Sequence, residues 1–311
     1  MDLNNTTLDG CLLVRQLQHP DKKMLLVGLY VTAAVNLIPA LLTVIVNGGL
    51  LALFIKTRSL HNPPTVFLGA LCLSDLLVGV ISQPLYLCII FTVVSSINPS
   101  FSLGLAFFLS MIIFAGMSYI LVFYITLDVY FAVCYPFKYE RFCTCKRFLL
   151  LVAGTWVYKV LPPFGGSLFY IWYYAIFTVI TLSIMIACYK RIYLAIREKN
   201  RAVVTVGTYS MEEKQARRRD KEDRKKTYTI ILLLSAFITC YFPTLVVSVT
   251  WFPTISSLRL CRFSPEAFFW FILAMFFLQF NSIINPIVYC IRLTPIRRAI
   301  LKLLNRRVQV L

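Results

Sequence analysis

Residues 24–55 read MLLVGLYVTAAVNLIPALLTVIVNGGLLALFI, an apolar stretch without a single charged side chain. A helix needs about 20 such residues to cross the roughly 30 Å of hydrocarbon in a bilayer. Six further stretches pass the same test, at 64–91, 101–134, 147–163, 168–189, 228–252 and 264–291. Inside a bilayer every backbone N–H and C=O needs an internal partner, so each crossing must be an α-helix. The sequence therefore predicts an all-α bundle of seven transmembrane helices.

The composition and the distribution of charge support this prediction. Hydrophobic residues make up 59% and charged residues only 14%, which excludes a water-soluble domain. Most of the 31 Lys and Arg residues lie in alternate gaps between crossings, at 56–62, 135–147, 190–226 and 292–311. Because basic residues near crossings are retained in the cytoplasm, we expect an extracellular N-terminus, a cytoplasmic C-terminus and a multi-pass protein of the plasma membrane. Contact with anionic lipid accounts for the net charge of +18, so we expect no nucleic-acid partner.

Three regions follow from these crossings. They are an extracellular N-terminal tail at 1–23, a seven-transmembrane domain at 24–291 with a cytoplasmic loop at about 197–226, and a cytoplasmic tail at 292–311. The tail should form a short amphipathic helix on the inner membrane surface, because an apolar stripe opposes basic residues there. The stripe is Ile296, Ile300, Leu303 and Leu304, opposite Arg297, Arg298 and Lys302. Between Arg147 and Lys190 two crossings leave little chain for a loop, which is either a tight turn or lacks a short piece.

Few polar residues lie in the middle of the predicted crossings, and Asp75 is the most expensive of them to bury. It is either a protonated aspartate hydrogen-bonded to neighbouring helices, or a carboxylate that pairs with a cation or switches its proton. The other mid-crossing polar residues are Asn47, Ser118, Asn281, Ser282 and Asn285. A bundle that buried all of them together would form one polar cluster, with the oxygen ligands that a hard cation prefers.

Short motifs at matching positions of several crossings resemble those of rhodopsin-like (class A) G-protein-coupled receptors. The motifs are Val46-Asn47-Gly48, Leu71-x-x-Ser74-Asp75, Asp128-Val129-Tyr130, Phe237-x-x-Cys240-Tyr241-x-Pro243 and Asn285-Pro286-Ile287-Val288-Tyr289. They occur in order at their correct crossings, and the resemblance covers about residues 30–304. Within the class the chain is most similar to the branch of adenosine and melanocortin receptors. The second outer loop is very short, and Gly104 stands where the third crossing usually has a cysteine.

The resemblance implies roles for two sets of residues. The first matches the positions that bind an allosteric sodium ion in inactive receptors, and its members are Asp75, Ser118, Asn281, Ser282 and Asn285. The alternative is a hydrogen-bonded cluster without sodium, and we expect no other cofactor. The second set is implied in activation and coupling, and it comprises Asp128, Val129, Tyr130, Tyr189, Asp223, Phe237, Pro243, Pro286 and Tyr289. Pro243 should kink the sixth crossing, whose inner half swings outward to open a cleft for a heterotrimeric G protein.

The chain departs from the class pattern where coupling is concerned. Val129 replaces the arginine that usually follows Asp128, and Asp223 matches the acid that would pair with that arginine. The inner ion pair of these receptors therefore cannot form. Either the remaining basic surface couples to the G protein, or the chain is an atypically coupled or signalling-silent homologue. Thr181 and Tyr241 also stand where a proline and a tryptophan are usual.

The outer half of the predicted bundle is aromatic and nearly uncharged. Met111 occupies the position where amine receptors carry an aspartate, so a monoamine ligand is not expected. Such a cavity suits an apolar or weakly polar small molecule from outside the cell. The expected lining residues are Gln83, Phe107, Met111, Tyr173, Tyr174, Phe177, Tyr241, Thr244 and Gln279. For many of the aromatic side chains the alternative is contact with lipid or packing between helices.

Two kinds of covalent modification are predicted outside the cell. Asn4 and Asn5 begin overlapping Asn-x-Thr acceptor sites, and we expect a glycan on one of them. As in some receptors of this kind, Cys11 and Cys261 could join the N-terminal tail to the third outer loop through a disulfide. The alternative is two free thiols.

Two other classes of membrane protein fit the sequence less well. Against a transporter, we expect no basic side chain within the crossings and only Asp75 as a mid-membrane acid, and there is no inverted repeat. An intramembrane enzyme would need a metal or an acid–base constellation, yet the chain has two histidines, His19 and His61, both in polar flanks. We therefore expect a receptor and not an enzyme.

Overall fold

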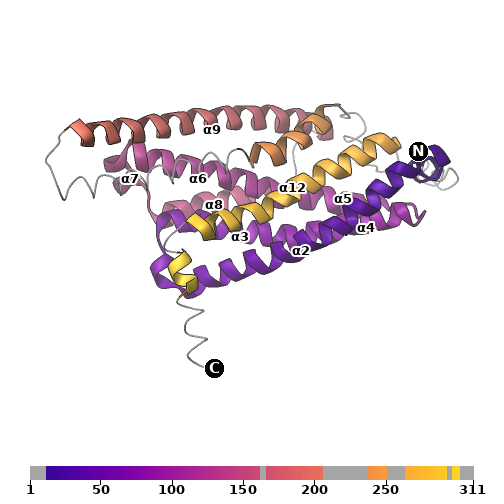
Figure 1. Cartoon of the computed structure of the whole chain (residues 1–311), viewed down its shortest axis with the longest axis horizontal. Helices are drawn as coiled ribbons and strands as arrows, with labels where there is room; N and C mark the ends of the chain where they lie inside the picture. Colours follow the sequence, from indigo (N-terminus) through magenta and orange to yellow (C-terminus); the bar gives the residue numbers. More distant parts are fainter. Residues whose placement is uncertain are drawn as a thin grey trace, which may run out of the picture.

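The structure is a computed structural model that describes residues 12–161, 166–205, 235, 237–250, 263–292 and 296–301. Every regular element among these residues is a helix, as predicted. The helices run side by side along one axis, with residues 12–17 at one end and residues 136–142 and 296–301 at the other (Figure 1). We name these ends after their short helices. The α1 end carries α1 (Leu12–Leu17), and the α7 end carries α7 (Pro136–Phe142).

Seven helical segments run along this axis within the described residues. The first three are α2 (Lys23–Lys56), then α3 (Pro63–Leu77) with η3 (Val78–Ser82) and α4 (Gln83–Val94), then α5 (Phe101–Ser110) with η4 (Met111–Ala115) and α6 (Gly116–Cys134). The last four are α8 (Cys145–Val160), α9 (Gly166–Thr205), the helix Phe237–Thr250 and α12 (Pro265–Arg292). Five of the seven are long and apolar enough to span a membrane. The predicted all-α bundle is confirmed.

Side-chain caps fix where several crossings begin. Asn62 accepts a hydrogen bond from the N–H of Thr65 at 3.3 Å, and Pro63 follows it at the first helical position. Ser100 caps α5, Thr144 caps α8 and Ser264 caps α12 in the same way. Each cap satisfies one of the N–H groups that a helix leaves without a partner at its start. These local signals keep the starts of the helices close to the predicted ones.

The burial pattern of α2 is the reverse of that in a water-soluble helix. Its outward side chains are apolar, and Val31, Ile38 and Ile45 are each more than half exposed. Its inward side includes Asn36 and Asn47, which are buried. Apolar side chains on the outside are stable only against lipid, since water would make such a surface associate. The protein is therefore a membrane protein with a partly polar interior.

Two π-helical turns interrupt the second and third crossings, and the sequence analysis did not predict them. In η3 the N–H of Gln83 bonds to the carbonyl of Val78, five residues earlier. Pro84 is the next residue. Proline has no N–H, and in a regular α-helix its ring clashes with the carbonyl four residues before it, so the wider π-helical turn removes this clash. At the end of η4, the Ala115 carbonyl accepts a hydrogen bond from the Tyr241 hydroxyl at 3.2 Å.

The fourth and fifth crossings differ in length from the predicted 147–163 and 168–189. Helix α8 ends at Val160, because residue 161 precedes a proline and is held in the extended region with ψ 129. Helix α9 continues to Thr205, well past the predicted start of a loop at residue 197. No proline or glycine interrupts the sequence between 190 and 205, so nothing there stops the helix.

Two short helices lie outside the crossings, one that was not predicted and one that was. Helix α1 lies within the predicted tail, and it packs on α2 and α12 with Leu13 and Leu17 almost fully buried. At the α7 end, residues 296–301 form a helix in which Ile296 is buried while Arg297 and Arg298 are exposed. Leu303 and Leu304 lie outside the described residues.

Candidate functional site

A buried polar cluster surrounds Asp75 in the middle of the bundle. The Asp75 side chain is 0% exposed and comes from α3. The Ser118 hydroxyl of α6 donates to one of its carboxylate oxygens at 2.7 Å, and the Asn285 amide of α12 donates to the other at 3.2 Å. A second hydroxyl, that of Ser74, lies 2.9 Å from the Ser118 hydroxyl. Three crossings thus meet at one carboxyl group.

A second layer of amides joins this cluster to the first crossing. The Asn47 amide donates to the carbonyl oxygens of Thr43 and Ser282, at 3.0 and 2.9 Å. Its own carbonyl oxygen is buried without a hydrogen-bond partner among the described residues. Asn281 and Ser282 are buried as well. The structure therefore buries all the residues of the predicted sodium site in one part of the bundle, together with oxygen atoms suited to a hard cation.

Five of the predicted pocket residues meet between η4, the helix Phe237–Thr250 and α12. Gln279 approaches the sulfur of Met111 with its amide nitrogen at 3.8 Å, and Thr244 donates to the Ala274 carbonyl at 3.3 Å. Phe107 is buried one turn before Met111 and packs edge-on against Phe271. These contacts bring together Phe107, Met111, Tyr241, Thr244 and Gln279.

Two buried amide side chains lack some or all of the hydrogen-bond partners that buried amides need. Gln83 is 0% exposed, and neither its nitrogen nor its oxygen has a hydrogen-bond partner within the described part of the chain. Asn36 donates to the Gln279 oxygen at 3.3 Å, but its own oxygen is unpaired there. An unpaired buried polar group costs about 1–3 kcal/mol, so these amides favour a polar group of a bound molecule or water beside them.

The structure places Tyr173 and Phe177 elsewhere, on the side of α9 that faces α6 and α8. Their rings stack at 5.9 Å, and the Tyr173 hydroxyl lies 2.7 Å from that of Tyr158 in α8. Phe177 also contacts the ring of Tyr119. The predicted pocket residues therefore divide into an inner group around Met111 and a lateral pair on α9. The side chain of Tyr174 lies outside the described residues.

Tyr119 links the third, fifth and sixth crossings. Its hydroxyl hydrogen-bonds the Thr181 hydroxyl and donates to the Thr178 carbonyl at 3.1 Å. Its ring lies 5.0 Å from the rings of both Phe237 and Tyr241. Thr181 stands where the class usually has proline, and its hydroxyl donates to the Phe177 carbonyl at 2.7 Å. Hydroxyl contacts thus connect the third and fifth crossings at the position where a proline would have bent the fifth, and ring contacts connect the third to the sixth.

At the α7 end, Asp128 has a partner other than residue 129. The Tyr139 hydroxyl of α7 donates to an Asp128 carboxylate oxygen at 2.7 Å, while Val129 is half-buried beside it. Burial, and then the hydrogen bond to Asp128, raise the pKa of Tyr139 well above its usual range, so its hydroxyl remains a donor. The Tyr189 hydroxyl lies 2.8 Å from that of Thr126. These contacts tie α7 and α9 to the end of α6.

The remaining predicted residues are only partly described. Pro243 and Pro286 lie inside continuous helices, and the Tyr130 ring packs edge-on against Tyr135. The side chain of Tyr289 is not among the described ones. The glycan acceptors, the proposed disulfide partners and the inner acid also fall outside the described residues; these are Asn4, Asn5, Cys11, Cys261 and Asp223. Those predictions remain predictions.

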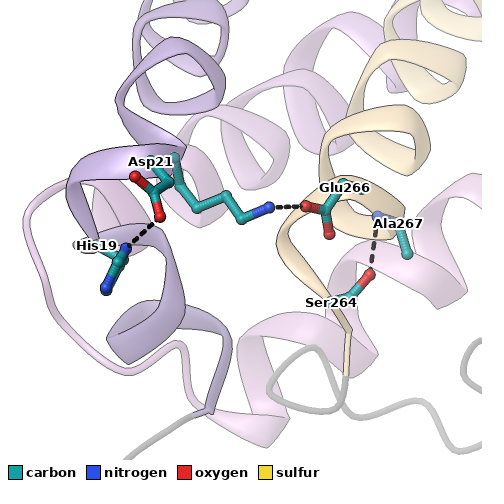
Figure 2. Close-up of polar contacts among 6 residues, drawn as sticks. His19, Asp21, Ser264, Glu266 and Ala267 are labelled. Carbon is teal, nitrogen blue, oxygen red and sulfur yellow. Dashed lines mark hydrogen bonds and ion pairs between the residues drawn. The ribbon is translucent and has the colours of Figure 1, made fainter.

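An ion pair at the α1 end holds the N-terminal region to the seventh crossing. Lys22 contacts the carboxylate of Glu266 at the start of α12, and Ser264 caps the same helix through the N–H of Ala267 (Figure 2). His19 lies 3.2 Å from Asp21 on the facing turn. Neither contact was predicted, and no pattern in the sequence pairs residues as far apart as Lys22 and Glu266.

We expect this ion pair to contribute little to stability, because both side chains are more than a third exposed. Lys22→Glu should lower the free energy of unfolding by about 1 kcal/mol or less, and the double exchange Lys22→Glu with Glu266→Lys should restore it. Thermal unfolding of the two single variants and the double variant checks this. Lys23→Glu, which changes the neighbouring exposed lysine, is the matched control. Strictly additive single effects would show that the pair has no coupling energy.

Three further residues of the interior were not predicted, namely Asn36, which is buried, and Tyr139 and Lys159, which are partly buried. Asn36 was visible as a polar residue in an apolar stretch, and Tyr139 gave no signal in its loop. Lys159 corrects a prediction, because we expected no basic side chain inside the crossings and it lies within α8 with its ammonium group directed at Gly116. The only signal in the sequence for this buried cation was the presence of a lysine at position 159, one residue before α8 ends.

Comparison with known proteins agrees with the observed bundle. The profile of the family described as "7 transmembrane receptor (rhodopsin family)" matches residues 46–164 and 162–289. Melanocortin receptor 5 of Bos taurus is 24% identical over 314 residues, which cover 96% of this chain and 91% of that receptor. The 5-hydroxytryptamine receptor 1B of Homo sapiens is 24% identical over 345 residues, covering 85% of this chain and 83% of that receptor. The two family matches meet at 162–164, just beyond α8.

Proposed function

The chain belongs to the rhodopsin family of seven-transmembrane receptors, and on this basis we propose that it binds a small, largely apolar extracellular ligand and opens a cleft for a heterotrimeric G protein at its α7 end. The family resemblance predicted from the motifs is confirmed. Members of this family are G-protein-coupled receptors of the plasma membrane. Beyond family membership, we propose the class of ligand, the face that meets the G protein, and the orientation of the receptor in the membrane, with the α1 end outside the cell.

One observation carries the proposed ligand class, namely the buried amides that have unpaired atoms: Gln83, and Asn36, which donates to Gln279 beside Met111. Gln83 and Gln279 offer hydrogen-bonding groups within an otherwise apolar and aromatic surround. No carboxylate of the described residues lies among them to pair with an amine. The name of one relative states that it binds 5-hydroxytryptamine, which is an amine, but the position of Met111 does not suit such a ligand here. An apolar molecule with one or two polar groups fits best.

The α7 end supports the proposed G-protein contact and also its alternative. Exposed cations lie along it, among them Arg141, Lys146 and Lys190. They form a basic surface that can meet an acidic partner. The hydrogen bond from Tyr139 to Asp128 occupies the carboxylate that would otherwise orient a residue at position 129. Val129 favours the second candidate function, a signalling-silent or atypically coupled receptor homologue.

Nucleotide exchange on each class of heterotrimeric G protein tests the proposal. We expect weak basal exchange from the natural chain and several-fold faster exchange from Val129→Arg, because arginine would place a cation beside Asp128 at the proposed cleft. Val129→Met, which adds bulk without charge, is the matched control. Cell-surface delivery is measured for each variant. If no variant catalyses exchange while delivery is normal, the coupling proposal fails and the silent homologue is favoured.

The cluster around Asp75 is the proposed sodium site. It combines a carboxylate, the Ser118 and Ser74 hydroxyls, and the unpaired oxygen of Asn47, which are hard oxygen ligands. A bound sodium ion would supply the positive charge that a buried carboxylate needs. Ion binding would hold α3, α6 and α12 together, because all three contribute to the cluster. A hydrogen-bonded cluster without sodium is the alternative.

A further inference from the structure

Lys159 is the one charged side chain of α8 that is directed into the bundle rather than toward the α7 end. It is partly buried near the end of the helix. Its ammonium nitrogen lies only 2.9 Å from the position that a Cβ atom on Gly116 would occupy. Gly116 begins α6, in the middle of the third crossing. The missing side chain at Gly116 therefore makes room for the cation.

No acid compensates this charge within the described residues. The two ion pairs found there lie at the α1 end and involve His19 and Lys22. The buried carboxyls of Asp75 and Asp128 are bonded to Ser118, Asn285 and Tyr139. A cation that stays inside a membrane bundle without a partner is unfavourable, and such residues usually mark a site of function. The surroundings of Lys159 therefore favour the binding of an anion beside its ammonium group.

A cavity lies directly beside the ammonium group. Its volume is about 30 Å³, and Tyr119, Tyr158, Tyr173 and Phe177 line it together with Gly116 and Lys159. A space of this size exceeds the 10–15 Å³ that one water molecule needs, so it can hold the two oxygens of a carboxylate. The hydroxyls of Tyr158 and Tyr173 meet at its edge, at 2.7 Å from each other.

The cavity adjoins a surface that faces lipid. Tyr158 is 50% and Tyr173 is 43% exposed. Val157, Val160 and Ile176, on the same two helices, are also more than half exposed. This apolar surface could bind an acyl chain, which an inorganic anion lacks. A ligand with both an anionic head and an apolar tail matches the cation and the surface together.

We propose that Lys159 binds the anionic head group of a membrane-dissolved amphiphile, whose tail lies along α8 and α9. The site is separate from the inner group around Met111. Its head would contact Tyr119, which reaches Thr181, Phe237 and Tyr241 on the far side. An occupant of this site therefore touches the residues that connect the third, fifth and sixth crossings, and it can alter how these helices pack.

Lipid binding to the full chain in phosphatidylcholine nanodiscs tests the proposal. Oleate and phosphatidylglycerol are added in separate arms, which distinguishes a free carboxylate from a phospholipid as the source of the anion. Native mass spectrometry counts the retained lipid, and thermal unfolding gives the shift in Tm. We expect one retained anionic lipid and a higher Tm for the natural chain in at least one arm. Methyl oleate, which has the same tail without the charge, should do neither.

Variants locate the site on the chain. Lys159→Met should weaken binding at least tenfold, and Lys159→Arg should retain it because the charge remains. Gly116→Leu, which would fill the space beside the ammonium, should weaken binding while leaving Lys159 in place. Lys56→Met removes an exposed cation at the end of α2 and should leave lipid retention and the shift in Tm unchanged.

Three results would overturn the proposal. The first is retention of oleate or phosphatidylglycerol by both Lys159→Met and Gly116→Leu. The second is an equal response to methyl oleate, which would mean that only the tail is recognised. The third is a rise in Tm with chloride alone that Lys159→Met abolishes, with no retained lipid in any arm. If Lys159→Met fails to fold, Gly116→Leu decides on its own. None of these readouts depends on G-protein coupling, so they are independent of the proposed signalling function.

Discussion

Replacing Asp75 by asparagine is expected to abolish the effect of sodium on the stability of the receptor. If sodium binds the Asp75 cluster, saturation at one hundred times the Kd should stabilise the natural chain by about 2.7 kcal/mol. Asparagine keeps the shape of the side chain and can still bond to Ser118, but it removes the charge that attracts the cation. Stability without sodium should not fall, because a buried charge no longer has to be accommodated.

The measurement is the Tm of detergent-solubilised or nanodisc-embedded receptor against sodium concentration. Choline chloride keeps the ionic strength constant, so that screening of surface charge does not contribute. Asp128→Asn is the matched control, since it removes the other buried aspartate of the crossings and leaves the cluster intact. An unchanged sodium response in Asp75→Asn would rule out this site. A natural chain that shows no sodium response would favour the hydrogen-bonded cluster without an ion.

Replacing Leu17 by aspartate should detach α1 from the rest of the bundle. Leu17 is 1% exposed, and a carboxylate without a partner at such a position costs several kcal/mol. A helix of six residues cannot offset that cost, so we expect α1 to leave the α1 end rather than bury the charge. The change removes most of the contact between the N-terminal region and α12.

Hydrogen exchange of the α1 amides is the appropriate measurement, because undocking exposes their N–H groups to solvent. Gln16→Asp provides the matched control, since Gln16 is the preceding residue on the same helix and is exposed. We expect near-complete loss of protection for Leu17→Asp and none for Gln16→Asp. Equal protection in the two variants would mean that α1 does not depend on the burial of its leucines.

The crossings were predictable because lipid imposes one simple requirement on each of them. An apolar stretch of sufficient length must be helical, and the caps at Asn62, Ser100 and Thr144 are local signals that appear in the sequence. The end of α8 was placed three residues too late, at 163, although the prolines at 162 and 163 are a local signal for its earlier end. The Asp75 cluster was also visible, since each of its members is a polar residue in an apolar surround.

The features that were missed depend on contacts between distant residues. Helix α1 looks like a polar tail, and only its packing on α2 and α12 explains why Leu13 and Leu17 are buried. The direction of the Lys159 side chain depends on Gly116, which lies in another crossing. The separation of Tyr173 and Phe177 from the residues around Met111 depends on how α9 is rotated. Helical periodicity alone does not fix that rotation.

The length of α9 has a mechanical consequence. At about 1.5 Å per residue, the helix spans about 60 Å from Gly166 to Thr205, and about 36 Å of that lies beyond Thr181. If the helix behaves as a rigid rod with its pivot at Thr181, a tilt of about 5° there moves Thr205 by about 3 Å. The helix is thus a lever whose short arm runs from Thr181 to Gly166 and carries Tyr173, and whose long arm extends past the α7 end (Figure 1). A small change in the contact between Tyr119 and Thr181 would therefore move Thr205 by about 3 Å, which is about the length of a hydrogen bond.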